Sequence, residues 1–240
     1  MAAIRVENAK ELEKMPTEYR NLLVHQVKGH TEGEMSGADD YIKIFYPMAP
    51  NVEEKHVCCE RAVEELDHYA RGAKVLADMG IDVSYMVQQD LKDRKLYATE
   101  AVQDIPNWEG RGLFSFLAEG AVLGQLSEMA DSSHRPLAES FPKILADEKL
   151  HIAHGFRITR EFCRTPEGRQ RVQDALKLWW PRALDVFGKS DSDRSRAYVQ
   201  WGLRKMTNGE ARDAYMKKVK PKLTALGLEV PPDHEGRKFM

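Results

Sequence analysis

The sequence predicts an all-α protein built on a four-helix bundle. Apolar residues recur at the three- and four-residue spacing of helices through most of the 240-residue chain, and no segment has the alternating pattern of a strand. The motif E-x-x-H-x-A-x-G occurs twice, at residues 65–72 and 148–155. A repeated motif on two long amphipathic helices favours two similar helical hairpins over any fold that contains a sheet.

The N-terminal part of the chain is expected to form the first hairpin. Residues 1–14 are a polar lead-in with one short helix, and Pro16 opens a long helix that runs to about Phe45. Residues 46–51 contain two prolines and predict a turn. The second long helix is expected to end at Gly80, since glycine is the usual residue at a helix C-terminus.

Three glycines interrupt the first long helix of this hairpin. Each disfavours a helix by roughly 1 kcal/mol relative to alanine. Tight packing or a local irregularity near Glu34 would explain their presence. They are Gly29, Gly33 and Gly37.

The second hairpin is expected to follow a crossover. Residues 81–108 are the least regular part of the chain, with a short helix around Val83 to Leu91. A long connection is needed there to join the two hairpins across the bundle. The third helix then runs from about Gly110 to Asp131, and the fourth runs from residue 136 to about residue 164.

Additional helices are expected after the bundle. Thr165 and Pro166 form an N-cap and a first-turn proline, and they open a helix that ends at Phe187-Gly188 and is broken or kinked at Pro181. Two more helices follow, and Pro221 interrupts the second of them. Their expected ranges are about 192–206 and 209–226.

The whole chain, residues 1–240, is expected to be a single domain. Its bundle core covers about 16–164, and its C-terminal helices cover about 165–228. The tail, 229–240, is rich in proline and charge, and we expect it to be extended or mobile.

Composition excludes several classes of function. The formal net charge of −2 gives no electrostatic case for nucleic acid or an anionic membrane as partner. No apolar run is long enough to span a bilayer, and the charged N-terminus does not resemble a signal peptide.

Three cysteines form neither a disulfide framework nor a zinc motif, and we expect Cys58 and Cys163 to be small apolar core residues. A cytoplasmic protein is expected.

The repeated motif places carboxylates and imidazoles together. In a helix, residues three apart lie on one face about one turn apart. Glu65 and His68 therefore point in the same direction, and Glu148 and His151 do so in the second copy. Both pairs lie within apolar stripes, where isolated charge is very costly and must be compensated.

The surroundings of the motif separate it from a chance match. Each copy ends in a glycine, Gly72 or Gly155, which allows a neighbouring helix to come close. Glu53 and His56 also fit E-x-x-H, but they lie in the first turns of a helix, where acidic side chains are favoured for other reasons. We interpret this third pair as surface residues.

Two further glutamates complete the ligand pattern of a dinuclear metal site. Glu34 precedes Glu65, and Glu119 precedes Glu148, by nearly the same distance along the chain. Bundles of this kind take one glutamate from each of two helices and a Glu-x-x-His pair from each of the other two. Two divalent cations would neutralise the four carboxylates, and the two imidazoles would complete the set.

Further stretches match a known family over nearly the whole chain from Met15 on. They are Met15-Pro16, Tyr19-Arg20, Leu23-Val24, Gln26, His30, Glu119-Gly120-Ala121, Gly155-Phe156, Trp179-Trp180-Pro181, Phe187-Gly188 and Val230-Pro231. Together with the two motifs, these stretches resemble the PaaA/PaaC-type ferritin-like family, and within it the catalytic subunits of phenylacetyl-CoA epoxidases.

The resemblance implies a ferritin-like fold and a di-iron monooxygenase that uses oxygen to epoxidise or hydroxylate an aromatic acyl-CoA or related substrate. A separate reductase would supply electrons, and the chain would form a homo-oligomer or a complex with a metal-free sister subunit. Nitrogen and oxygen ligands suit two iron ions, with manganese as an alternative. The implied ligands are Glu34, Glu65, His68, Glu119, Glu148 and His151. At the position of Glu119 the family's catalytic subunit carries aspartate.

The residues around the ligands allow several interpretations. Metal-bound histidines usually donate their other N–H to a carboxylate, for which Glu64, Asp67 and Asp147 are candidates. His30 lies one turn before Glu34 and could support that ligand, line a pocket or be a satisfied core histidine. His154 is interpreted as a residue that binds no metal.

Two other functions stay open at this point. One is a ferritin-like protein that handles iron or peroxide, although such a protein does not need the helices after Arg164. The other is a non-catalytic helical scaffold subunit, which would bind no stoichiometric metal. Fold alone does not decide between them.

Overall fold

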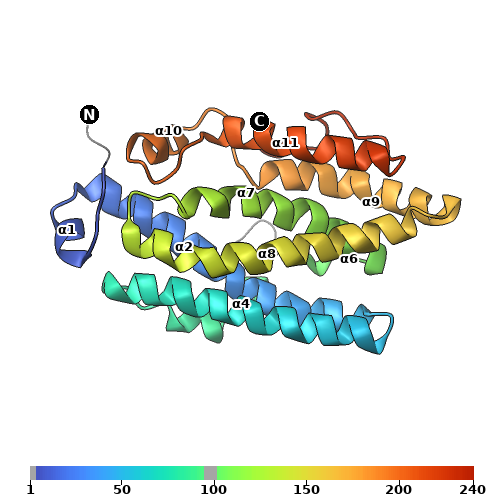
Figure 1. The fold of residues 1–240 in the computed structure, drawn as a ribbon, viewed down its shortest axis with the longest axis horizontal. Coiled ribbons are helices and arrows are strands. Elements are labelled where there is room, and N and C mark those ends of the chain that lie inside the picture. The colour runs from blue at the N-terminus through green and yellow to red at the C-terminus, as the bar shows by residue number, and fades with distance from the viewer. Residues whose placement is uncertain (1–3, 95–101) are drawn as a thin grey trace. The chain divides into compact units, whose positions relative to one another are not determined.

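The computed structural model describes residues 4–94 and 102–240, and helices account for the regular structure in those ranges (Figure 1). A single bridge there joins two extended residues, Val6 and His134. The all-α prediction is confirmed, and the helical architecture agrees with the ferritin-like class. The part of the expected crossover at residues 95–101 lies outside the described residues.

The chain divides into two compact units. The first consists of Met1–Asp104, Glu128–Ile144 and Ala197–Lys205. The second consists of Ile105–Ser127, Leu145–Arg196 and Met206–Met240. Each unit contains one copy of the repeated motif and one of the two further glutamates. The single domain stays a prediction.

The first unit is built on a long helical hairpin. Helix α1 (Ala9–Glu13) precedes α2 (Thr17–Asp40), which continues through a π-helical turn at Tyr41–Phe45 into α3 (Tyr46–Met48). Helix α4 (Val52–Asp78) forms the returning arm. The turn between the two arms is therefore shorter than the predicted range of 46–51. Pro47 lies in the first turn of α3, where proline is tolerated.

Helix α4 has clear start and stop signals. Asn51 caps its N-terminus, and the Asn51 side chain accepts a hydrogen bond from the backbone N of Glu54 at 2.9 Å. Gly80 follows the helix with φ +75°, a left-handed conformation that glycine adopts without strain. The face of α4 that carries the motif is buried, including Cys58, Glu65 and His68.

The second hairpin has an irregular first arm. Helix α6 (Trp108–Phe114) leads into a π-helical turn at Ser115–Glu119 and then into α7 (Gly120–Met129). Helix α8 (Arg135–Phe162) carries the second motif, and only its C-terminal part belongs to the second unit. The third helix expected from about Gly110 to Asp131 is present, with a π-helical turn within it.

Three helices follow the second hairpin. They are α9 (Pro166–Asp185), α10 (Asp193–Gln200) and α11 (Asn208–Ala225). Thr165 caps α9 as expected, since its side chain accepts from the backbone N of Gly168 at 3.1 Å. Pro181 lies inside α9 and Pro221 lies inside α11, so neither proline breaks its helix. Tertiary packing overrides the local penalty of proline.

Two expectations about irregular segments need correction. The short helix expected around Val83 to Leu91 is replaced by two 3₁₀ turns, Ser84–Val87 and Leu91–Asp93. Helix α10 ends well before the expected residue 206, because Gly202 adopts φ +65° just after it.

The C-terminal tail is anchored rather than free. Asp185 is only 2% exposed, and its carboxylate accepts hydrogen bonds from the backbone N of Lys238 at 2.6 Å and of Phe239 at 3.1 Å. Arg237 Nε also donates to Asp185 at 3.3 Å. A buried carboxylate needs such partners, so the tail supplies them.

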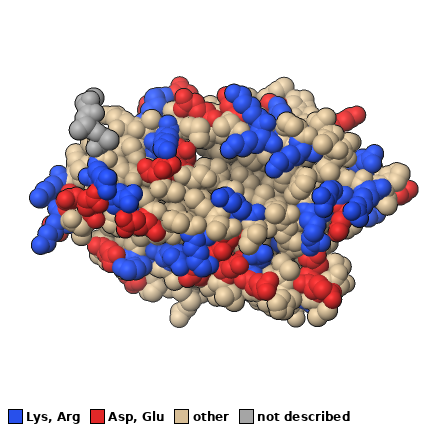
Figure 2. Space-filling model, viewed as in Figure 1, with Lys and Arg blue, Asp and Glu red and all other residues tan. Residues whose placement is uncertain are grey.

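The surface and the cysteines agree with the composition. Basic and acidic side chains are intermixed on the face drawn in Figure 2, as the net charge of −2 suggests. Cys58 and Cys163 are buried as expected, whereas Cys59 is exposed. Within residues 4–94 and 102–240, no helix is both long and apolar enough to cross a membrane.

The two motif glycines allow close approach of helices, as the sequence predicted. A Cβ atom at Gly155 would lie 2.6 Å from Ser115 Cβ and 2.7 Å from the backbone N of Phe116. A Cβ atom at Gly72 would collide with the side chain of Thr31. Gly155 is the more constrained position, because backbone cannot rotate away as a side chain can.

We predict that Gly155→Ala lowers the free energy of unfolding by about 1–3 kcal/mol, the usual cost of overpacking. Gly29→Ala is the matched control, because Gly29 lies inside α2 and a Cβ atom added there would meet no other atom within 4 Å. That variant should be neutral or stabilising by up to about 1 kcal/mol. Urea unfolding of both variants tests the difference, and equal effects would contradict the close packing.

Candidate metal centre

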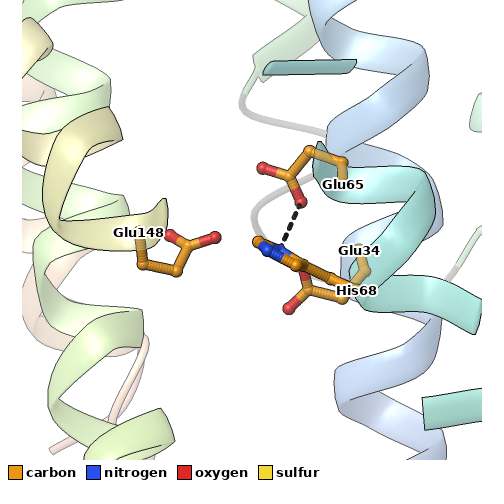
Figure 3. Close-up of side chains that lie close together, drawn as sticks. All are labelled: Glu34, Glu65, His68 and Glu148. Carbon is orange, nitrogen blue, oxygen red and sulfur yellow. Dashed lines mark hydrogen bonds and ion pairs between the residues drawn. The ribbon is translucent and has the colours of Figure 1, made fainter. Parts of the chain in front are cut away.

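The first unit brings Glu34 from α2 together with Glu65 and His68 from α4 (Figure 3). His68 Nδ1 lies 3.1 Å from Glu34 Oε2 and 4.0 Å from Glu65 Oε2. All three side chains are buried, and their ligand atoms lie within 4.8 Å of one another. Two carboxylates and one imidazole in such a group are suitable ligands for a divalent cation. We call these three residues the first half-site.

Gly37 clears the space that the first half-site occupies. A Cβ atom at this position of α2 would lie 2.9 Å from Glu65 Cδ. The expectation of tight packing near Glu34 is thus confirmed for Gly37. It does not explain Gly29, which has open space around it.

His30 and His68 hold Glu34 from two sides. His30 Nδ1 lies 2.8 Å from Glu34 Oε1, and His68 Nδ1 approaches the other carboxylate oxygen. Burial alone would raise the pKa of the Glu34 carboxyl, but the charge and hydrogen bond of His30, together with the hydrogen bonds of His68 and Glu65, outweigh it and hold that pKa well below its usual range. Glu34 is therefore ionised.

The second unit contains Glu119, Glu148 and His151, which we call the second half-site. Glu148 is 4% exposed and His151 is fully buried, and His151 Nδ1 lies 3.7 Å from Glu148 Oε1. Glu119 is the last residue of the π-helical turn. Such turns are rare and often occur at functional sites, because they change the direction of the side chains that follow.

Glu119 is in a different electrostatic state from Glu34. Burial raises the pKa of the Glu119 carboxyl, and the Arg111 and His151 charges lower it only in part, while the nearby Glu148 carboxylate raises it further. Glu119 Oε2 is buried, and it has no hydrogen-bond partner within the described part of the chain. An unpaired buried carboxyl oxygen is costly, so this donor set fits a bound cation.

Other residues near the motifs have partners of their own. Asp67 accepts from Arg71 Nε at 2.8 Å, and Glu64 pairs with Arg61. These two candidates for supporting the ligand histidines therefore bind arginine, and Asp147 stays a prediction.

The histidines outside the two half-sites differ in burial and in their contacts. Glu53 and His56 are exposed, which confirms the surface interpretation of the third E-x-x-H pair. His154 is buried, with its ring 6.5 Å from the ring of Trp108. His30 contacts Glu34 directly, which favours a supporting role among the three that the sequence allowed.

Sequence reasoning missed two features of the site. The π-helical turn before Glu119 has no residue signature that distinguishes it from a regular helix. The second feature is the fully buried Arg111, whose charge lowers the pKa of Glu119. Its position about two helical turns before Glu119 was the sequence signal that could have revealed it.

Comparison with known proteins gives two matches. The model of the PaaA/PaaC family, described as phenylacetic acid catabolic protein, matches residues 1–239. The A subunit of 1,2-phenylacetyl-CoA epoxidase from Escherichia coli strain K12 is 27% identical over 224 residues, which cover 91% of this chain and 72% of that protein.

We predict that Glu119→Gln stabilises the metal-free protein at neutral pH. The pKa of Glu119 is raised in the folded state. The contribution of this carboxyl to stability is therefore fully present below the pKa of a glutamate in the unfolded chain, about 4.3, and it is lost as pH rises through the pKa of the folded state. A neutral glutamine avoids that loss. Glu119→Gln should therefore be more stable than the wild type above the pKa of the folded state, and no more stable than the wild type below about pH 4.3.

Thermal unfolding with a chelator between pH 4 and pH 8 measures this difference. Glu34→Gln is the control of opposite sign, since the lowered pKa of Glu34 stabilises the fold at neutral pH. If Glu119→Gln were the less stable protein at pH 7, the electrostatic description of the second half-site would be wrong.

Proposed function

Because the chain belongs to the PaaA/PaaC family of phenylacetic acid catabolic proteins, we propose that it is a di-iron monooxygenase acting on an aromatic acyl-CoA or a related substrate. The main observation is that each unit holds a half-site of the same composition, two glutamates and one histidine, in which every residue is buried except the half-buried Glu119. The matching relative is named as a subunit of an epoxidase that acts on phenylacetyl-CoA. Epoxidation or hydroxylation is therefore the proposed reaction.

We propose that the two half-sites together hold two metal ions. The six residues of the two half-sites would be the ligands, and Glu148 would contribute to the same metal centre as Glu34, Glu65 and His68. The charges support this assignment, because two divalent cations would neutralise the four glutamates. Iron is the proposed metal, and manganese is the alternative for the same nitrogen and oxygen ligands.

When bound, the iron ions would supply oxygen activation, with two electrons from a reductase and two protons reducing one oxygen atom to water. The chain's own residues would supply position and dryness. His30 holds the Glu34 carboxylate at 2.8 Å, which fixes the orientation of that ligand. Burial of Glu34, Glu65 and His68 excludes water, which strengthens electrostatic interactions within the first half-site.

Proposed partners follow from the same relation. The relative is one subunit of its enzyme, so we propose that this chain works either with a metal-free sister subunit or as a homo-oligomer. A separate reductase would deliver the electrons. We further propose that the protein acts in the cytoplasm.

The first test is anaerobic titration of the metal-free protein with iron(II), and in parallel with manganese(II). We predict two ions per chain for the wild type. The double variant Glu65→Ala/His68→Ala should lose at least one ion, because it removes two of the three ligands of the first half-site. Glu53→Ala/His56→Ala is the matched control, since it removes an exposed pair of the same spacing on the same helix.

The outcome distinguishes the alternatives. Iron taken up far beyond two ions per chain, with growth of a ferric mineral, would favour storage. No binding by the wild type would leave a scaffold subunit. An equal loss of metal in both double variants would contradict the ligand assignment.

The second test is product formation from phenylacetyl-CoA with oxygen-18 gas and a reductant, measured by mass spectrometry. The loaded wild type, together with its partner subunit where one is required, should add one labelled oxygen atom. Two bound irons without any labelled product from a panel of aromatic acyl-CoA thioesters would contradict the proposed substrate class.

A further inference from the structure

Gln26 is a buried amide without a partner. It lies in α2 and is 3% exposed. Neither its Nε2 nor its Oε1 atom has a hydrogen-bond partner among the residues that the structure describes. Buried side-chain amides are hydrogen-bonded in the large majority of cases, so this one requires an explanation.

His30 lies one helical turn after Gln26 on the same face of α2. It is 8% exposed, and its ring packs 5.0 Å from the ring of Phe141. His30 Nδ1 contacts Glu34 Oε1, whereas His30 Nε2 is buried and has no partner within the described residues. Gln26, His30 and Glu34 thus form one buried polar column along a single face of α2.

The chemistry of the ring determines what His30 Nε2 needs. A carboxylate only accepts hydrogen bonds, so the proton faces Glu34 and lies on Nδ1. In the neutral ring Nε2 is then an acceptor and requires a donor. The Gln26 amide offers two donors and an acceptor, and a water molecule can bridge them because buried waters typically make two to four hydrogen bonds.

We propose that Gln26 and His30 bind a buried water molecule and that Gln26 thereby positions Glu34 through His30. The water would donate to His30 Nε2 and be held by the Gln26 amide. It keeps the His30 proton on Nδ1, which keeps His30 as the donor to Glu34. The role of Glu34 as a metal ligand rests on the proposed function, whereas the water site does not.

The second half-site has polar residues at the same offsets. Ser115 precedes Glu119 by the interval that separates His30 from Glu34, and Arg111 takes the place of Gln26. Both are fully buried. Buried polar residues at both offsets before the ligand glutamate are thus common to both units.

The test that needs no metal is nitrogen-15 NMR of the His30 ring. In the wild type we expect a single tautomer with a slowly exchanging proton on Nδ1. Gln26→Met preserves the length of the side chain but removes the amide, so it should give a mixture of tautomers and faster exchange. Gln26→Asn keeps an amide and should preserve the wild-type tautomer.

The second readout is affinity for iron(II), titrated anaerobically. Gln26→Met should weaken binding of one ion about ten- to hundred-fold, the usual effect of losing a group that orients a ligand. Gln125→Met is the matched control, because Gln125 Nε2 donates to Val186 O at 2.9 Å and its loss affects only stability. Gln26→Asn should recover most of the affinity.

Each result bears on the proposal. An unchanged His30 tautomer in Gln26→Met would overturn it, and so would an unchanged iron affinity or equal losses in Gln26→Met and Gln125→Met. If Gln26→Met does not fold, loss of the Nδ1 tautomer in Gln26→Asn would overturn it instead. If the wild type binds no iron, the proposed function fails, but the NMR result still decides the water site.

Discussion

Burial of carboxylates beside imidazoles is the constraint on which the rest of this structure depends. Taking an ionised glutamate out of water is very costly unless nearby groups compensate it. In the first unit the compensation is nearly complete, because Glu34 lies between His30 and His68 and its pKa is lowered. In the second unit Glu119 keeps a raised pKa despite the Arg111 charge. The groups around Glu34 thus compensate its buried charge, whereas the groups around Glu119 leave its pKa raised.

Helix packing is adapted to this constraint at the expense of local helix stability. Gly37 weakens α2, but its missing side chain makes room for the Glu65 carboxylate. Gly155 weakens α8, but its missing side chain lets the backbone of Phe116 come closer than a Cβ atom would allow. Both glycines lie one to two turns from ligand residues. Their placement indicates that the chain gives up helix propensity in order to bring polar side chains together.

The sequence was sufficient where the signal was local and repeated. The two E-x-x-H copies, the cap at Asn51 and the glycine stop at Gly80 follow directly from helix geometry, and the structure agrees with them. The assignment of six metal ligands stays a prediction, although the ligand atoms of Glu34, Glu65 and His68 lie together as the pattern requires.

The sequence was insufficient where tertiary partners decide the outcome. The π-helical turn at Ser115–Glu119 changes the winding of a helix without any local residue signal. The tail was expected to be extended or mobile because it is rich in proline and charge, but the buried Asp185 binds it. Pro181 and Pro221 remain inside helices because packing outweighs one lost hydrogen bond. The unpartnered amide of Gln26 is likewise visible only once burial is known.

Anomalous diffraction from crystals of the iron-loaded protein tests the central claim most directly. Data collected on both sides of the iron absorption edge locate each ion and identify it as iron. We predict two iron positions, one bound by Glu34, Glu65 and His68 and the other by Glu119, Glu148 and His151. Iron found only at exposed acidic residues, with both half-sites empty of metal, would contradict it.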